Sequence, residues 1–289
     1  MGQSHYFKCS IPSTMEGWDI YEINVNFEPN DPTRYQPCVE LNIEETIDVW
    51  VFFRGEFAPR GIINQLYGKK IWVSTEPIER QDVNNLFFGN GKDFVREHRK
   101  LFDYMTHYDE TEVDKINQTL QVNQAFPLPT NLLTHDVEYK QKLYDGVFLG
   151  RVNERRSVLL GAIKKDYDFL HVDHGLIGPE SIRAHNQARI GISLQVGDFK
   201  QFPHRVMNMM ACGLPIICDE LTHTNFLKEG EEKYFCFMKD NSPIKMYEAF
   251  KKLLEDEDWR ITCGKKMREI VEREFDASKK WKELLEVIV

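Results

Sequence analysis

The chain has 289 residues, of which 42% are hydrophobic and 12% aromatic, so it can bury one large core or two smaller ones, and we expect two compact domains. Its longest apolar runs, such as residues 49–53, fall far short of the roughly 20 residues that a membrane-spanning helix needs, so we expect no membrane insertion. The 37 basic and 46 acidic residues give a formal net charge of −9, which offers no overall attraction to a nucleic-acid backbone.

The six cysteines are scattered, with no Cys-x-x-Cys pair and no spacing typical of a zinc site. Residues 1–6 have neither the basic start and apolar stretch of a signal peptide nor a myristoylation pattern. We therefore expect free thiols, a reducing compartment and a cytoplasmic location. The basic residues form only short pairs, such as Arg155 with Arg156, which we expect to lie on solvated faces.

In the first half of the chain, residues 47–53 and 70–74 are short apolar segments with the β-branched and aromatic residues typical of buried strands. The segment between them is compatible with a helix, so together they predict a βαβ unit. A third strand is expected at residues 102–106.

The acidic and polar residues 110–121 are typical of a surface helix. Residues 126–129 should form an extended connector, because Pro127 and Pro129 disfavour helix in the residues that precede them. A domain boundary is therefore expected near residue 140.

The second half of the chain alternates strands and helices at the spacing of βα units. The predicted strands are 146–150, 169–172, 190–194 and 215–218. The predicted helices are 155–163, 179–188 and 203–212, followed by helices to the end of the chain. Such alternation indicates a parallel, doubly wound sheet, in which ligands bind at the carboxyl ends of the strands.

The most specific segment is residues 205–217, which read RVMNMMACGLPII. Gly213 suits the left-handed conformation that ends many helices, and Pro215 begins the next strand. Arg205 and Asn208 are three residues apart, so they share one helical face near the helix start. An arginine at a helix N-terminus makes a site for an anion.

This segment resembles the donor-binding helix of GT-B glycosyltransferases, where a string similar to Glu-Ala-Met-Ala-Cys-Gly-Leu-Pro joins helix to strand. It most resembles the CgeB-like (spore-maturation type) glycosyltransferases, because an arginine in that family stands three residues before the position usually held by glutamate. Residues 144–156 resemble the strand-Gly-Arg loop that opens the C-terminal domain of the superfamily. Arg151 and Arg156 occupy the places of basic residues that face the donor diphosphate there.

The resemblance implies an α/β fold with GT-B architecture, in which two Rossmann-like domains have parallel sheets that face each other across a cleft. Residues 1–140 would form the N-terminal Rossmann-like acceptor domain and residues 141–270 the C-terminal donor-binding domain. Residues 271–289 would form a helix that packs back toward the N-terminal domain. The resemblance covers most of residues 142–275, while the N-terminal half matches only in strand order.

The donor site implied by the resemblance consists of Gly150, Arg151, Arg156, Lys200, His204, Arg205 and Asn208. Many retaining members carry a glutamate at the position of Asn208 and another eight residues earlier, where this chain has Lys200. An asparagine both donates and accepts, so it can still bind ribose hydroxyls, and Lys200 could contact phosphate. Arg151 and Arg156 are equally well explained as solvated residues at a helix start, and His204 as a capping residue.

Neither a metal nor another cofactor is expected, because cationic side chains and helix N-terminal amides can stabilise a leaving nucleotide diphosphate. His171 and His174 do not predict a metal site, since on a strand they would point to opposite faces. The candidate general bases are Glu56 and Glu76, which follow two predicted N-terminal strands. Each is also explained as an acid at a helix start or in a turn.

The resemblance implies a glycosyltransferase that moves a sugar from a nucleotide-sugar donor, by default a UDP-sugar, to a glycan, protein, small molecule or modified DNA. One alternative is a non-catalytic GT-B protein with a structural or assembly role. A sugar-nucleotide epimerase is disfavoured, because Lys200 and Asn208 stand where acids are expected. A phage-type enzyme that glycosylates hydroxymethylated DNA bases is disfavoured by the acidic net charge.

Overall fold

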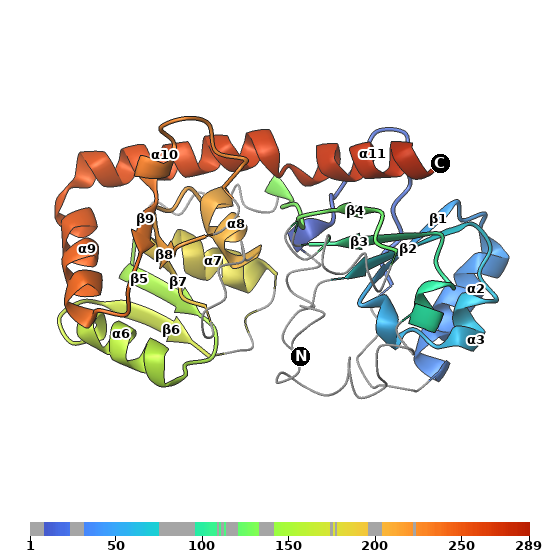
Figure 1. Ribbon diagram of the computed structural model, residues 1–289, viewed down its shortest axis with the longest axis horizontal. Helices are drawn as coiled ribbons and strands as arrows, with labels where there is room; N and C mark the ends of the chain where they lie inside the picture. The colour runs from blue at the N-terminus through green and yellow to red at the C-terminus, as the bar shows by residue number, and fades with distance from the viewer. Residues whose placement is uncertain are drawn as a thin grey trace. The chain divides into compact units, whose positions relative to one another are not determined.

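The computed structural model describes residues 9–23, 32–74, 96–108, 110, 113, 121–132, 142–173, 176, 178–195, 204–221 and 224–289. The chain divides into two compact units (Figure 1). The larger unit comprises Met1–Met15 with Leu128–Trp281, and the smaller unit comprises Glu16–Pro127 with Lys282–Val289. The acceptor, donor and C-terminal helix roles assigned to residues 1–140, 141–270 and 271–289 stay predictions.

The described part of the smaller unit contains a sheet of parallel strands in the order β1-β2-β3-β4. The strands are β1 Val49–Phe53, β2 Lys69–Ser74, β3 Tyr104–His107 and β4 Gln124–Ala125. The strands predicted at 47–53, 70–74 and 102–106 are therefore confirmed, with small shifts at their ends. Strand β4 was not predicted, because two residues are too few to show a strand pattern.

The helical elements of the smaller unit between residues 32 and 63 are short. They are η1 Pro32–Tyr35, α2 Gln36–Glu44, η2 Gly55–Phe57 and α3 Arg60–Ile63. The last two lie between β1 and β2, as the βαβ prediction requires. The core of this unit packs Trp72 and Met105 of the sheet against Ile63 of α3 and against Phe102. Most of the surface helix predicted at 110–121 falls outside the described residues.

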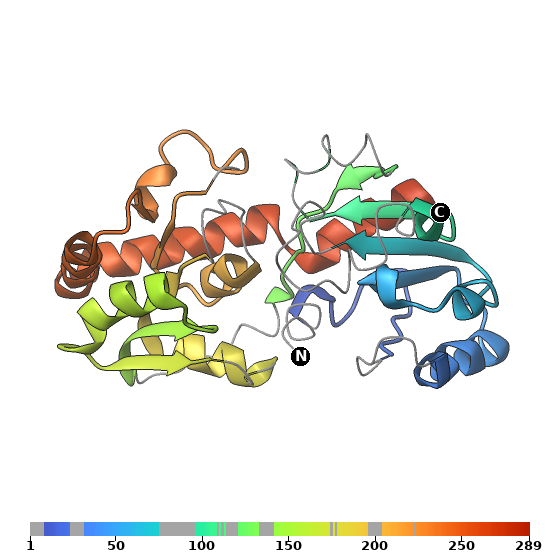
Figure 2. The same ribbon diagram turned by 60° about the horizontal axis from the view of Figure 1, so that its bottom comes forward.

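The sheet of the larger unit has the order β6-β5-β7-β8-β9, and all neighbouring strands are parallel (Figures 1 and 2). The strands are β5 Tyr144–Leu149, β6 Phe169–Val172, β7 Ala188–Ser193, β8 Ile216–Asp219 and β9 Cys236–Met238. The four strands predicted in this half are confirmed. Only helices were expected after residue 218, and strand β9 corrects this expectation. The sequence did not show this strand because a short edge strand has too few residues for a clear pattern.

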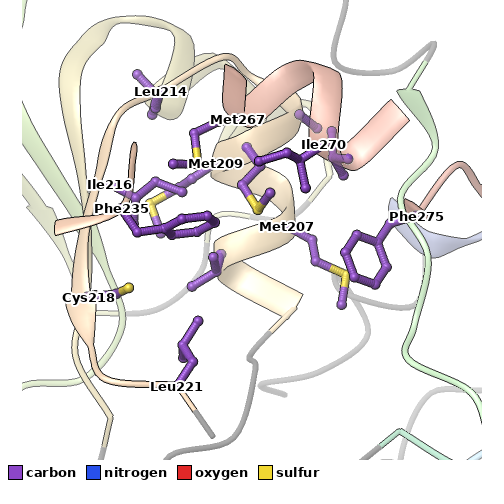
Figure 3. Close-up of a cluster of buried hydrophobic side chains, with 14 of the residues drawn as sticks. Met207, Met209, Leu214, Ile216, Cys218, Leu221, Phe235, Met267, Ile270 and Phe275 are labelled. Atoms are coloured by element: carbon purple, nitrogen blue, oxygen red, sulfur yellow. The ribbon is translucent and has the colours of Figure 1, made fainter. Parts of the chain in front are cut away.

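Helices cover both faces of this sheet. They are α6 Glu154–Lys164, α7 Pro179–Asn186, α8 His204–Ala211, α9 Pro243–Glu255 and α10 Glu257–Glu274, with the short η4 Glu232–Tyr234 before β9. Helix α11 Ala277–Ile288 is divided between the two units, because the larger unit ends at Trp281 and the smaller unit includes Lys282–Val289. Successive strand residues point to opposite faces, so Val147 packs with α8 and α10, and Phe148 packs with α6 and α9. Figure 3 shows the first of these cores, in which Met209 of α8 lies near Met267 of α10 and Met207 lies near Phe275.

Helix α8 ends as the sequence predicts. Gly213 has φ +64°, the left-handed conformation that a glycine adopts without steric cost. Gly264 of α10 lies beside it, because a Cβ atom on Gly264 would be 2.2 Å from the Gly213 carbonyl oxygen. The two glycines therefore allow α8 and α10 to approach closely. No helix within the described residues is both long enough and apolar enough to span a membrane.

Candidate functional site

The carboxyl edge of the larger sheet contains a topological switch point between β5 and β7. From β5 the chain continues to β6 on one side, and from β6 it crosses to β7 on the other side. In open parallel sheets, ligands bind outside the carboxyl ends of the strands at such a point. Helix α6 follows β5 and helix α8 follows β7, so both helix N-termini lie at this edge.

Arg205, in the first turn of α8, reaches the end of β5. A Cβ atom on Gly150 would lie 3.4 Å from Arg205 Nη2 and 3.5 Å from Cζ. Gly150 has φ +148°, a conformation that L side chains rarely adopt. The Arg205 Cζ atom also lies 5.4 Å from the centre of the Phe148 ring. The glycine at the end of β5 therefore leaves the space in which the arginine head lies.

The Arg205 guanidinium has unused donors within the described residues. Its Nε and Nη1 atoms are buried and have no hydrogen-bond partner among those residues. Burial of charged donors without partners is unfavourable, so such groups are normally paired. The planar fork of a guanidinium matches the adjacent anionic oxygens of a phosphate group. The arrangement is therefore suited to binding an anion.

His204 and Asn208 lie one turn apart on α8. His204 Nε2 is 3.0 Å from the Pro129 carbonyl oxygen, and its Nδ1 is 3.5 Å from Asn208 Nδ2. Asn208 is 1% exposed, and its Oδ1 atom is buried without a hydrogen-bond partner in the part of the chain that the structure describes. These groups form a polar chain that starts at a main-chain carbonyl and ends at a buried acceptor.

Arg156 binds main-chain groups at the same edge. Its guanidinium donates to the carbonyl oxygens of Arg151 and Leu194, each at 2.5 Å. Its backbone N–H donates to the side chain of Asn153, which caps α6. Arg156 is 4% exposed and ties the segment after β5 to the segment after β7, whereas the Arg151 side chain is exposed.

Arg155 forms an ion pair with Asp219 that the sequence analysis missed. One guanidinium nitrogen pairs with Asp219 Oδ1, and Nη1 lies 3.2 Å from Oδ2 and 3.0 Å from the Gln195 carbonyl oxygen. The Gln195 N–H donates to Asp219 Oδ2 at 2.5 Å, and Arg155 Nε donates to Asn241 Oδ1 at 2.5 Å. This network joins α6 to the end of β8 and to the segments that follow β7 and β9.

The expectation that Arg155 and Arg156 lie on a solvated face is wrong. Arg156 is buried and the Arg155 side chain is 20% exposed, because both heads bond to groups at the sheet edge. The signal available in the sequence was Asp219, an acid that directly follows a predicted buried strand. In a parallel sheet, the residue that ends one strand and the helix start that follows another strand lie at the same edge. An acid after one strand can therefore pair with a basic residue at such a helix start.

His171, at the end region of β6, also contacts this edge. Its Nε2 lies 3.2 Å from the Gly150 carbonyl oxygen and 2.9 Å from the Asp173 carboxylate. His174 and Lys200 fall outside the described residues. Within the described ranges, no group of three or more His, Cys, Asp or Glu side chains is arranged to hold a metal ion.

The base candidates belong to the smaller unit. Glu56 is 7% exposed and accepts from Arg54 Nε at 2.5 Å and from Trp72 Nε1 at 3.1 Å. Arg54, just after β1, is in the left-handed conformation with φ +60°. Both Glu56 oxygens thus accept hydrogen bonds from neighbouring side chains. Glu76 falls outside the described residues.

A cavity of about 410 Å³ lies elsewhere in the larger unit. It is lined by Pro12, Ser13, Thr14, Asn131, Leu132, Glu272, Asp276, Ser278 and Lys279. None of these residues follows a strand of the β6-β5-β7-β8-β9 sheet, and two of the three charged ones are acids. The cavity is therefore less suited to an anion than the switch point is.

Solved glycosyltransferases share this fold. Sucrose-phosphate synthase from Thermosynechococcus elongatus has a TM-score of 0.62 at 12% identity, over 96% of this chain and 87% of that chain. An α-glucosyltransferase solved with UDP and a 13-mer DNA containing an HMU base has a TM-score of 0.62 at 10% identity, over 88% of this chain and 83% of that chain. TarM, known from S. aureus, has a TM-score of 0.60 at 11% identity, over 88% of this chain.

The chain spans 58% of the length of TarM. Identities near 10% show the fold alone, and the predicted α/β class with GT-B architecture is confirmed. Residues 147–286 match the family described as Glycosyl transferase-like. The matched range includes Gly150, Arg205 and Asn208. No curated protein sequence matches the chain.

Proposed function

We propose that this protein is a nucleotide-sugar-dependent glycosyltransferase whose donor site lies at the switch point of the larger unit. The observation that carries the proposal is the Arg205 head, which lies against Gly150 and has buried donors without partners among the described residues. The glycosyl transferase-like match over residues 147–286 supports the reaction class. The CgeB-like assignment remains a finer proposal that rests on the spacing of Arg205 and Asn208.

In this proposal the Arg205 guanidinium pairs with the donor diphosphate, and the N-terminal amides of α6 and α8 add positive potential. Negative charge grows on the diphosphate as the bond to the sugar breaks, so these groups stabilise the transition state more than the ground state. The site proposed here uses no metal ion. Arg156 holds the edge together through Arg151 and Leu194, and so positions the site without contacting the donor.

The default donor is a UDP-sugar. Structures of similar fold hold UDP or UDP-glucose, among them the α-glucosyltransferase and the Anabaena protein HepE. The buried acceptor Asn208 Oδ1 is suited to a ribose hydroxyl of such a donor. The acceptor substrate stays open among a glycan, a protein, a small molecule and modified DNA.

We also propose a reducing, cytoplasmic location. All six cysteines are free thiols, and Cys9, Cys38, Cys218 and Cys263 are buried. Disulfides are common in oxidising compartments, so a chain with six free cysteines fits a reducing one.

Calorimetry with UDP and GDP tests the donor site. Arg205→Ala should weaken binding of the preferred nucleotide about 10- to 100-fold, because a hydrogen bond to a charged group contributes about 1.5–3 kcal/mol. The matched control is Arg189→Ala. The Arg189 side chain is 45% exposed and pairs with Asp145, and both residues lie near the amino ends of their strands, away from the proposed site. A wild-type protein that bound neither UDP nor GDP would contradict the proposal.

Incubation with a panel of nucleotide sugars tests the reaction. Transfer or slow donor hydrolysis supports a glycosyltransferase, and an altered sugar on an intact nucleotide indicates an epimerase. Binding without turnover against cell extracts favours the non-catalytic alternative. Salt-dependent binding to duplex DNA with hydroxymethylated bases would favour DNA as the acceptor.

A further inference from the structure

The two ring nitrogens of His204 have different partners. A carbonyl oxygen can only accept, so the 3.0 Å contact with Pro129 requires a proton on Nε2. In the neutral imidazole, Nδ1 is then an acceptor and faces Asn208 Nδ2 at 3.5 Å. The Asn208 NH2 group therefore points toward His204, and its Oδ1 atom points away.

The Pro129 carbonyl is held in a fixed position, because the residues that follow it form main-chain hydrogen bonds. Thr130 N–H donates to the Phe275 carbonyl at 2.7 Å, and Asn131 N–H donates to the Cys9 carbonyl at 2.7 Å. Thr130 also pairs with Asp276 as a parallel bridge. The position of the Pro129 oxygen is thus set by segments distant in the sequence.

Asn208 differs from an ordinary buried asparagine in how its amide is satisfied. Its amide has one side directed at His204, and its Oδ1 atom is buried with no hydrogen-bond partner among the described residues. An unsatisfied buried acceptor costs about 1–3 kcal/mol and calls for an explanation. A ligand hydroxyl that donates to Oδ1 would remove this cost.

We propose that His204 is a positioning residue that fixes the Asn208 amide, so that Asn208 presents only an acceptor to a hydroxyl of the donor ribose. The inference rests on the proposed function, because it takes the ligand to be a nucleotide. His204 itself does not contact the donor. With the amide fixed in this way, the site prefers a ribose over a deoxyribose, because the deoxyribose lacks the hydroxyl that would donate to Asn208 Oδ1.

Two variants separate the two ends of the His204 ring. Glutamine places its amide near the position of Nε2, so His204→Gln keeps a donor for Pro129 but removes the acceptor that orients Asn208. Asparagine places its amide near the position of Nδ1, so His204→Asn keeps an acceptor for Asn208 but loses the bond to Pro129. His204→Phe removes both contacts.

The measurement is the Kd ratio of 2′-deoxy-UDP to UDP, and of 3′-deoxy-UDP to UDP, by calorimetry. Wild type should prefer UDP over at least one deoxy form by about 5- to 10-fold, the effect of one hydrogen bond of about 1 kcal/mol. The ratio should fall toward one in His204→Gln and His204→Phe, and persist in His204→Asn. His98→Gln is the matched control, because His98 Nε2 bonds the Gly55 carbonyl at 2.9 Å in the smaller unit.

Wild type that binds UDP with no preference over either deoxy form overturns the inference and leaves the proposed function standing. An unchanged ratio in His204→Phe overturns it as well. If wild type binds neither UDP nor GDP, the proposed function fails and this inference with it. In the ligand-free protein, long-range ¹H–¹⁵N spectra should show His204 protonated at Nε2 alone, and protonation at Nδ1 alone would also overturn the inference.

Discussion

Arg155 at the start of α6 and Asp219 at the end of β8 form an ion pair between residues 64 positions apart in the chain. Their side chains are 20% and 11% exposed, so most of the pair is removed from water. The same carboxylate accepts the Gln195 N–H, which places it at the start of the segment that leads from β7 toward α8. The pair therefore joins the connections beside the proposed donor site.

Asp219→Ala should lower the free energy of unfolding by about 3 kcal/mol, because it leaves the Arg155 charge and the Gln195 N–H without their partner. Urea denaturation followed by circular dichroism measures the change. Lys251→Ala is the control, since its ion pair with Glu255 spans 3.8 Å between side chains that are 50% and 67% exposed. The control should change stability by less than about 0.5 kcal/mol. Equal losses in the two variants would contradict this account.

The strands of the larger sheet could be predicted because buried parallel strands are continuous apolar runs between turns. Residues 146–150 and 190–194 show such runs, and β5 and β7 lie there. The proximity of Gly150 and Arg205 also follows from the fold. Gly150 follows one parallel strand and Arg205 begins the helix after another, so both lie at the carboxyl edge of the sheet. The left-handed Gly213 is a local property that its position after a helix shows directly.

The hydrogen bonds within the site could not be predicted in the same way. The Arg155 partner is 64 residues distant, and the Pro129 carbonyl that binds His204 is 75 residues distant. Sequence spacing does not show such contacts, because they depend on how loops close over the sheet edge. Arg156 illustrates the consequence, since its position in the motif does not show that its head bonds the carbonyls of Arg151 and Leu194.

Gly150→Ala should weaken UDP binding by about tenfold or more, because the new Cβ atom at φ +148° strains the backbone and lies against the Arg205 head. Calorimetry measures the loss, and strain should also lower stability by about 1–3 kcal/mol. Gly161→Ala is the control on α6, where a Cβ atom would meet nothing within 4 Å. It should raise stability by about 1 kcal/mol, because alanine favours helix over glycine. Undiminished UDP binding by Gly150→Ala would count against the donor site.

Gly264→Ala should separate α8 from α10. The added Cβ atom would lie 2.2 Å from the Gly213 carbonyl oxygen, so one of the two helix backbones must move. Overpacking of this kind costs about 1–3 kcal/mol, and the urea midpoint should fall accordingly. Because α8 carries Arg205 and Asn208, UDP affinity should fall with it. A variant with unchanged midpoint and affinity would show that the helices can shift without consequence.

His98 should make the protein less stable in mild acid. Burial lowers the pKa of its imidazole below the ordinary value of 6.5, the Gly55 carbonyl partly opposes this shift, and the charge of Arg60 adds to it. The unfolded chain therefore binds a proton near pH 6.5 that the folded chain binds only at lower pH, so stability falls as pH decreases below about 6.5. His98→Gln removes this titration while keeping a side-chain donor for the Gly55 carbonyl.

Urea denaturation between pH 5 and pH 8 measures the His98 effect. Wild type should lose stability on going from pH 7 to pH 5, and His98→Gln should lose less over the same interval. Other acidic and basic groups titrate equally in both proteins, so the difference between the two curves isolates His98. Parallel curves would show that His98 has the same pKa in the folded and unfolded chains. The burial of His98 against Trp72 and Phe102 would then not exclude water from its ring.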